Sequence, residues 1–246
     1  MRGRSASFAC AAAVTRAGMS ALRATAPGGR ARWGRTNHAG RAVGLYAGPA
    51  SAVGAAAGAA AVHPGAGLAV LAAGVCGAYD DVAGDHRRGF RAHLRALRDG
   101  EVTSGAVKLF GVSAAALVAG ALMKERAADK VLAGVVIAGA AHCANLVDVR
   151  PARAAGAVLA LGVPGLLREG PGGELAAVAL GCAAAVLPDD LRERVMLGDA
   201  GAHALGAALG TAVVARNRGA GLLAHAVAVV AAAACGDRVT AWARSL

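Results

Sequence analysis

The stretch GAVKLFGVSAAALVAGALM at residues 105–123, followed by KVLAGVVIAGAAHCANLV at 130–147, decides the fold class. Both runs are almost free of charged residues, and only a short charged segment beginning at Lys124 separates them. A helix needs about 20 predominantly apolar residues to cross the hydrocarbon core of a bilayer. These two runs therefore predict a pair of membrane-embedded helices joined by a short loop.

The same pattern continues on both sides of this pair. The chain of 246 residues is 57% apolar but only 3% aromatic, and it contains 36 glycines. Small residues of this kind allow helices to approach closely inside lipid. We therefore predict an all-α, polytopic membrane bundle of eight or nine transmembrane helices, with residues 28–246 forming a single transmembrane domain. Besides the first pair, the apolar segments lie at about 44–62, 65–79, 154–167, 174–187, 200–215 and 219–236.

The first 27 residues are weakly apolar and are interrupted by Arg16 and Arg23. Arg2 and Arg4 precede the apolar part, and basic residues in this position are typical of a signal peptide. Cleavage would, however, place the basic segment 30–41 outside the cell, against the charge distribution of the other loops. We expect residues 1–27 to form a weak span or an interfacial helix.

The basic residues lie mainly in alternate loops. Loops 28–43, 80–104, 148–153 and 188–199, together with the tail from residue 237, carry fifteen arginines. The loops on the other side carry six basic residues. The positive-inside rule predicts that the first set faces the cytoplasm across the plasma membrane. This distribution, rather than nucleic-acid binding, accounts for the net charge of +11.

Four carboxylates and one lysine lie at the predicted cytoplasmic ends of the apolar segments, namely Asp80, Asp81, Asp148, Asp199 and Lys108. Each one alone is explained as a helix cap or an ion-pair partner, and a lysine near a membrane surface can extend to water. Taken together, they come from separate segments on one side and can converge on a single site. Their oxygen donors suit Mg²⁺, which favours one or two carboxylates plus substrate phosphates.

Four other polar residues receive no role at this stage. His142 and His203 lie inside apolar runs and are interpreted as packing residues. Asp189 and Asp190 are interpreted as solvated loop residues.

The order of these elements resembles the polyprenyl-phosphate N-acetylhexosamine-1-phosphate transferase family, which begins the assembly of peptidoglycan and other cell-wall polymers. The resemblance covers residues 35–215. It rests on Asp80-Asp81, Asn145-Leu146-Val147-Asp148, Gly198-Asp199-Ala200-Gly201, the segment Thr103–Gly111 with Lys108, and loop 35–49.

This resemblance implies a reaction in which a polyprenyl phosphate attacks the β-phosphate of a UDP-N-acetylhexosamine and displaces UMP. It implies Asp199 and Asp80 as Mg²⁺ ligands, with Asp80 or Asp81 positioning or deprotonating the lipid phosphate. Asn145 and Asp148 would orient the nucleotide sugar, and Lys108 would hold a phosphate. Arg87 or Arg88 would assist. Mg²⁺ would neutralise the pyrophosphate and the departing UMP.

Several alternatives stay open beside this interpretation. At 149–152 the chain reads Val-Arg-Pro-Ala, where the family usually has Gly-Leu-Asp-Gly. A catalytically inactive relative that binds lipid phosphate or acts as a scaffold of cell-envelope assembly is therefore the main alternative. A CDP-alcohol phosphatidyltransferase would need an Asp-Gly-x-x-Ala-Arg pattern that the chain lacks. A transporter would place its charges near the bilayer midplane. A homodimer is also left open.

Overall fold

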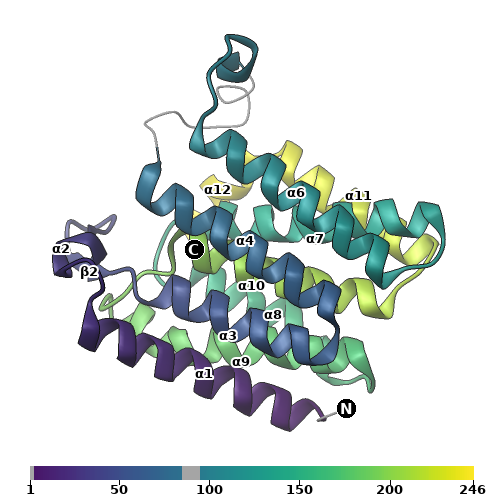
Figure 1. Cartoon of the computed structure of the whole chain (residues 1–246), viewed down its shortest axis with the longest axis horizontal. Coiled ribbons are helices and arrows are strands. Elements are labelled where there is room, and N and C mark those ends of the chain that lie inside the picture. The colour runs from purple at the N-terminus through teal and green to yellow at the C-terminus, as the bar shows by residue number, and fades with distance from the viewer. Residues whose placement is uncertain (1–2, 85–94) are drawn as a thin grey trace.

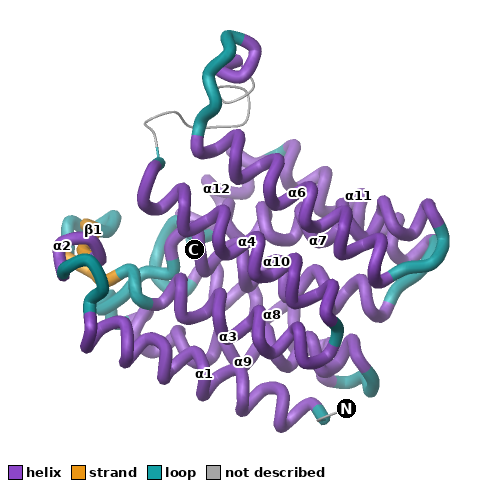
Figure 2. The backbone as a smooth tube through the Cα atoms, in the orientation of Figure 1, coloured by secondary structure: helices purple, strands orange, loops and turns teal. Residues whose placement is uncertain are grey.

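The computed structural model describes residues 3–84 and 95–246, and in these ranges the chain is a bundle of helices with one short β-hairpin (Figures 1 and 2). The strands β1 (Gly34–Thr36) and β2 (Ala42–Gly44) pair antiparallel, with Arg35 opposite Val43. The helices are α1 (Arg4–Thr25), α2 (Arg30–Trp33), α3 (Ala47–Val62), α4 (Pro64–Ala83), α6 (Ser104–Met123), α7 (Ala127–Val147), α8 (Arg153–Leu166), α9 (Pro171–Leu191), α10 (Gly198–Arg216), α11 (Ala220–Ala234) and α12 (Gly236–Ser245).

All eight predicted apolar segments are helices, and local chemistry fixes several of their ends. Prolines occupy the first helical position of α4 and α9, where a missing N–H costs no hydrogen bond. The hydroxyl of Thr103 accepts a hydrogen bond from the Ala106 N–H and caps α6. The predicted all-α membrane fold is therefore confirmed.

Fewer helices of the described chain than predicted are long and apolar enough to cross a membrane by themselves. By length and hydropathy, four helices of the described chain can cross a membrane, namely α4, α6, α7 and α9. The bent pair α11 and α12 would be a fifth. Helices α3 and α8 have only 16 and 14 residues. The predicted count of eight or nine spans is not confirmed and stays a prediction.

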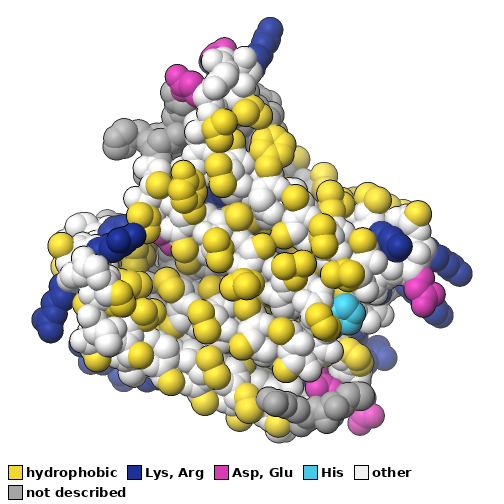
Figure 3. All heavy atoms as spheres, in the orientation of Figure 1, with side chains coloured by type: hydrophobic (Ala, Val, Ile, Leu, Met, Phe, Trp, Pro, Cys, Tyr) yellow, Lys and Arg dark blue, Asp and Glu magenta, His cyan; other side chains and the backbone are white. Residues whose placement is uncertain are grey.

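Helix α10 lies at the centre of the bundle and packs against α3, α4, α7, α8 and α9. Small residues permit this. A Cβ added to Gly206 would lie 2.4 Å from the Ala140 carbonyl oxygen of α7, so only glycine fits there. Large apolar side chains instead gather on the outside, on α4, α6 and α11, and Figure 3 shows apolar side chains spread over one face of the molecule. This distribution is expected when the solvent around the bundle is lipid.

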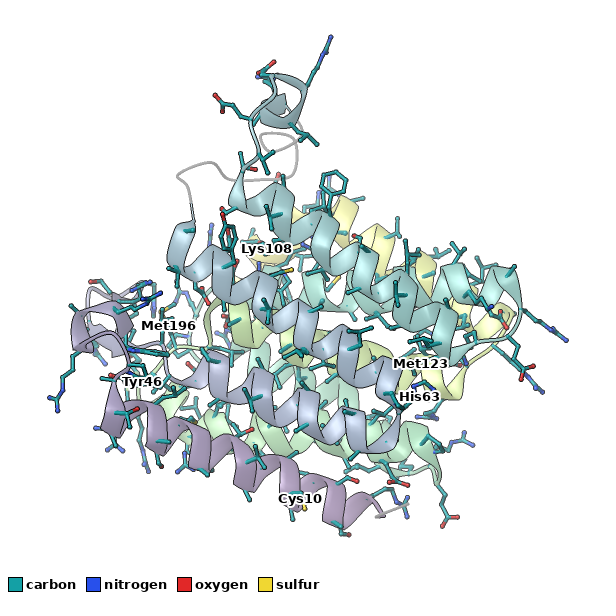
Figure 4. The ribbon with its side chains drawn as sticks, in the orientation of Figure 1. Cys10, Tyr46, His63, Lys108, Met123 and Met196 are labelled. Carbon is teal, nitrogen blue, oxygen red and sulfur yellow. The ribbon has the colours of Figure 1, made fainter. Side chains whose placement is uncertain are left out.

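The bundle has two distinct ends, which we call the hairpin end and the far end. At the hairpin end, the Gly44 N–H donates to the Arg194 carbonyl at 3.2 Å, which attaches the β-hairpin to the loop before α10. At the far end, Lys124 donates to the Asn217 carbonyl at 2.8 Å. Figure 4 shows Lys108, Tyr46 and Met196 toward one end and His63 and Met123 toward the other.

Helix α1 packs along α3 and α9 and reaches both ends of the bundle. Arg4 donates to the Leu166 carbonyl at the far end. Arg16 forms an ion pair with Asp189, near the hairpin end, at 2.6 Å. Residues 1–27 thus include a helix that is part of the packed bundle, and its assignment as a weak span or an interfacial helix stays a prediction.

Candidate functional site

The N-terminus of α10 is held by the carboxylate of Asp81, from the last turn of α4. Its two oxygens accept hydrogen bonds from the backbone N–H groups of Asp199 and Ala200, each at 3.0 Å. A carboxylate at this position also interacts favourably with the positive end of the helix dipole. Both oxygens of Asp81 are therefore engaged in positioning Asp199, and its predicted role toward lipid phosphate stays a prediction.

Two glycines let the backbone of α3 and α4 approach this same turn. A Cβ at Gly77 of α4 would lie 2.3 Å from the Asp199 carbonyl oxygen. A Cβ at Gly48 of α3 would lie 2.3 Å from the Leu197 carbonyl oxygen. The start of α10 is thus fixed by close backbone packing on two sides.

Lys108, which lies about one turn inside α6, joins the acidic groups of two other helices. Its ammonium group donates to Asp80 Oδ2 at 2.6 Å and also to Asp199 Oδ2. The three side chains are between 17% and 26% exposed, so the pairs are shielded from water without being sealed off. Lys108 therefore meets carboxylates rather than extending to the surface. Three predicted site residues from α4, α6 and α10 form one ionic network.

A cavity of about 230 Å³ opens beside Lys108. Asn145 of α7 contributes to its wall, as do His142 and His203. The His203 ring donates from Nδ1 to the Asp199 carbonyl at 2.8 Å, which ties it to the ionic network. The cavity combines one cationic end with an apolar wall. Its lining consists of Gly105, Lys108, Leu109, Val112, Ser113, Ala138, His142, Asn145, Leu146 and His203.

Asp148 lies just after α7 and lines a second cavity, of about 120 Å³, under the β-hairpin. Asp190 lines the same cavity and accepts a hydrogen bond from the Ala152 N–H at 2.8 Å. Burial raises the pKa of Asp148 well above its usual value, and the carboxylates of Asp190, Asp199 and Asp81 raise it further. Asp148 is therefore electrostatically coupled to the network but lines a different cavity from Lys108.

The β-hairpin lines this second cavity and is attached to its neighbours by residues of loop 35–49 for which no individual role is predicted. Asn37 and Arg41 donate to the two carboxylate oxygens of Glu193, at 2.6 and 2.9 Å. Arg35 donates to the Asp81 carbonyl at 2.7 Å. The first predicted cytoplasmic loop therefore contacts the end of α4 and the loop before α10.

Two sequence interpretations change at this point. Asp190 is only 4% exposed and is not a solvated loop residue, because its carboxylate accepts a hydrogen bond from the backbone N–H of Ala152, in the loop between α7 and α8. His203 is buried as expected, but it also contacts Asp199. Arg87 and Arg88, predicted to assist, lie outside the described residues.

The donor set can be compared with what Mg²⁺ requires. In the described ranges, no group of three or more His, Cys, Asp and Glu side chains is arranged to hold a metal ion. Asp80 and Asp199 nevertheless place two carboxylates around one cationic group, the Lys108 ammonium. Two carboxylates fit Mg²⁺ when substrate phosphates and water supply its other ligands. They do not form a complete metal site of their own.

Comparison with known proteins adds nothing to this geometry: no protein-family model matches the chain, and a comparison with curated proteins gives no match.

Proposed function

We propose that the chain is a membrane glycosyl-1-phosphate transferase. It would move an N-acetylhexosamine 1-phosphate from a UDP-sugar to polyprenyl phosphate, with release of UMP, in cell-envelope polymer synthesis. The observation that supports this most directly is the Asp80–Lys108–Asp199 network, which three helices form beside a cavity with an apolar wall. The proposal includes the eight or nine spans and a site facing the cytoplasm across the plasma membrane.

The reaction brings two anionic phosphates together, so positive charge must be supplied where they meet. Lys108 places its ammonium group within hydrogen-bond reach of both Asp80 and Asp199. It would hold a substrate phosphate, as a compact point charge does. Asp80 and Asp199 would then be free to hold Mg²⁺, which would neutralise the pyrophosphate and stabilise the departing UMP.

The two cavities suggest a division of the substrates. The cavity beside Lys108 has Leu109, Val112 and Ala138 in its wall, which suits the first part of an isoprenoid chain. The cavity under the β-hairpin is lined by Asp148, Asn37 and His38, which suits the polar nucleotide sugar. Asn145 lies in the wall of the first cavity and would face the phosphates between the two.

One observation favours the alternative of an inactive relative that binds lipid phosphate or acts as a scaffold. Residues 149–152 supply no further carboxylate, and Arg150 and Pro151 line the cavity instead. Such a protein would keep Lys108 and the apolar cavity for lipid phosphate but would not release UMP.

The test is UMP release by the full chain, purified in detergent, with polyprenyl phosphate, Mg²⁺ and a panel of UDP-N-acetylhexosamines. We expect release that requires both the lipid and Mg²⁺, and we expect Asp199→Asn to abolish it. Asp129→Asn is the matched control, because Asp129 is a buried carboxylate at the far end that bonds the Gly219 N–H at 2.9 Å. Release that persists in Asp199→Asn would remove Asp199 from the mechanism. No release from protein that still binds polyprenyl phosphate would favour the inactive relative.

A further inference from the structure

The last helix of the described chain, α12, lies at a sharp angle to α11, the helix before it. α11 is a run of 15 mostly apolar residues with Leu223, Val227 and Val230 exposed on its surface. α12 follows after a bend of 79° at Cys235. When α11 lies within the apolar layer of a membrane, a helix at nearly a right angle to it runs along the membrane surface.

One side of α12 is attached to the bundle at the hairpin end. Ala243 is 1% exposed, and the Thr240 hydroxyl donates to the Leu146 carbonyl at 3.0 Å. Leu146 belongs to the last turn of α7, directly after Asn145. The position of α12 is therefore fixed relative to the ionic network.

Away from these bundle contacts, α12 exposes an aromatic side chain and two arginines. Trp242 is 59% exposed, and Arg238 and Arg244 are also exposed. Tryptophan is enriched where a membrane meets water, because its ring is apolar and its N–H is polar. Basic residues on a surface helix are attracted to anionic lipid headgroups.

The only other tryptophan of the chain lies at the same end of the bundle. Trp33 stacks on Tyr46 with ring centroids 5.2 Å apart, and Arg30, Arg32 and Arg35 are its neighbours in sequence. Both tryptophans, each with arginines nearby in the sequence, therefore lie at the hairpin end, where α12 also lies.

We infer that α12 is a membrane-surface helix that binds the anionic headgroups of the leaflet at the hairpin end. Trp242 lies in the boundary between headgroups and acyl chains, and Arg238 and Arg244 contact lipid phosphates. The partner is the lipid leaflet itself. This inference does not depend on the transferase activity.

The test uses the fluorescence of Trp242 in the full chain, reconstituted into vesicles of phosphatidylcholine and phosphatidylglycerol. Subtracting the spectrum of Trp242→Phe from that of the parent isolates Trp242 without altering the β-hairpin. We expect blue-shifted emission that aqueous iodide quenches weakly. Lipids brominated near the headgroup end of the acyl chain should quench it more strongly than lipids brominated near the chain end.

The lipid specificity is tested with the double variant Arg238→Gln/Arg244→Gln. In the parent, brominated phosphatidylglycerol should quench Trp242 more than brominated phosphatidylcholine at equal mole fraction, and the double variant should lose this preference. Arg216→Gln/Arg218→Gln, at the far end, is the matched control and should keep it.

Three outcomes would each overturn the inference: water-like emission with full iodide quenching, strongest quenching by bromine at the chain ends, or emission that depends on protein concentration rather than on lipid. An equal response to both brominated lipids in the parent would overturn the anionic preference.

Discussion

The two ends of the bundle use the same residue types for different purposes. At the far end, Lys124 donates to a backbone carbonyl and Asp129 accepts from a backbone N–H. At the hairpin end, Lys108 binds the side chains of Asp80 and Asp199 instead. A charged side chain that hydrogen-bonds to the backbone fixes a loop in place. Charged side chains that bind one another beside a cavity can instead bind a ligand there. The comparison separates structural charge from the charge available for chemistry.

The strongest way to break this comparison is to remove each lysine in turn. Lys108→Met should lower UMP release about 100-fold or more, because it removes a cation at the position where phosphate charge develops. Lys124→Met should leave turnover unchanged and lower the free energy of unfolding by about 1 kcal/mol, the typical loss of one hydrogen bond. Turnover and denaturant unfolding of both variants in detergent measure the two effects.

Mg²⁺ binding by the Lys108→Met variant can be measured without substrate, because this variant leaves two carboxylates unpaired. Asp80 and Asp199 would then repel each other in a shielded setting, and a divalent cation could take the place of the ammonium. We expect Mg²⁺ to raise the melting temperature of this variant more than that of Lys124→Met. An equal response of the two variants would argue against Mg²⁺ binding at the Asp80 and Asp199 pair.

A substitution at Gly77 should damage the hairpin end by packing alone. In Gly77→Ala the new Cβ would meet the Asp199 carbonyl oxygen at 2.3 Å, so the start of α10 must shift. Overpacking of this kind typically costs about 1–3 kcal/mol. Gly156→Ala in α8 is the matched control, because nothing lies within 4 Å of its added Cβ. Its stability should stay unchanged or rise by up to about 1 kcal/mol, since alanine favours helix over glycine. Similar melting temperatures for the two variants would contradict the close approach.

Removing the cap of α10 should have a somewhat smaller effect. Asp81→Ala leaves the Asp199 and Ala200 N–H groups without their carboxylate partner, which typically costs about 0.5–2 kcal/mol. Because Asp199 is positioned by this cap, turnover should fall along with stability. Asp189→Ala, which removes ion pairs with the exposed arginines Arg16 and Arg194, is the control and should change neither quantity appreciably. A fall in turnover of Asp81→Ala with unchanged stability would instead give Asp81 a direct chemical role.

The smallest expected effect concerns the pH dependence of stability. The raised pKa of Asp148 means that the folded state holds its proton more tightly than the unfolded chain does. Its contribution is therefore fully present below about pH 4, the unfolded value, and is lost as pH rises through the folded pKa. Asp148→Asn should melt higher than the parent at neutral pH by about 2–4 °C, with no difference near pH 4. Parallel melting curves of parent and variant across this range would contradict the coupling.

The helices could be predicted from the sequence, but the number of spans could not. Segments 105–123 and 130–147 face lipid over much of their length, so their hydropathy identifies them directly. Segment 200–215 forms the central helix α10, which protein surrounds and which therefore needs small residues rather than strongly apolar ones. Hydropathy therefore identifies α6 and α7 directly, whereas the buried α10 is too weakly apolar to pass the same test.

The site residues that could be predicted from the sequence are charged residues at the ends of apolar segments. Lys108 and Asp199 are conspicuous because a charge at the end of an apolar run needs a partner. Asp190 and Glu193 were missed, because their partners are a backbone N–H at Ala152 and side chains of the β-hairpin, far away in sequence. The capping role of Asp81 depends on how α4 meets α10, which no spacing in the sequence encodes.

The central position of α10 has a consequence for how the protein is made. Insertion of a helix into a membrane depends on its own hydrophobicity, and α10 carries Asp199, His203 and many glycines and alanines. α10 is also absent from the helices apolar enough to cross a membrane by themselves. As one of the predicted spans, α10 would therefore depend on α4 and α7, against which it packs, for its entry into the bilayer. The ionic network at the hairpin end can therefore form only after α10 has packed against the neighbouring helices.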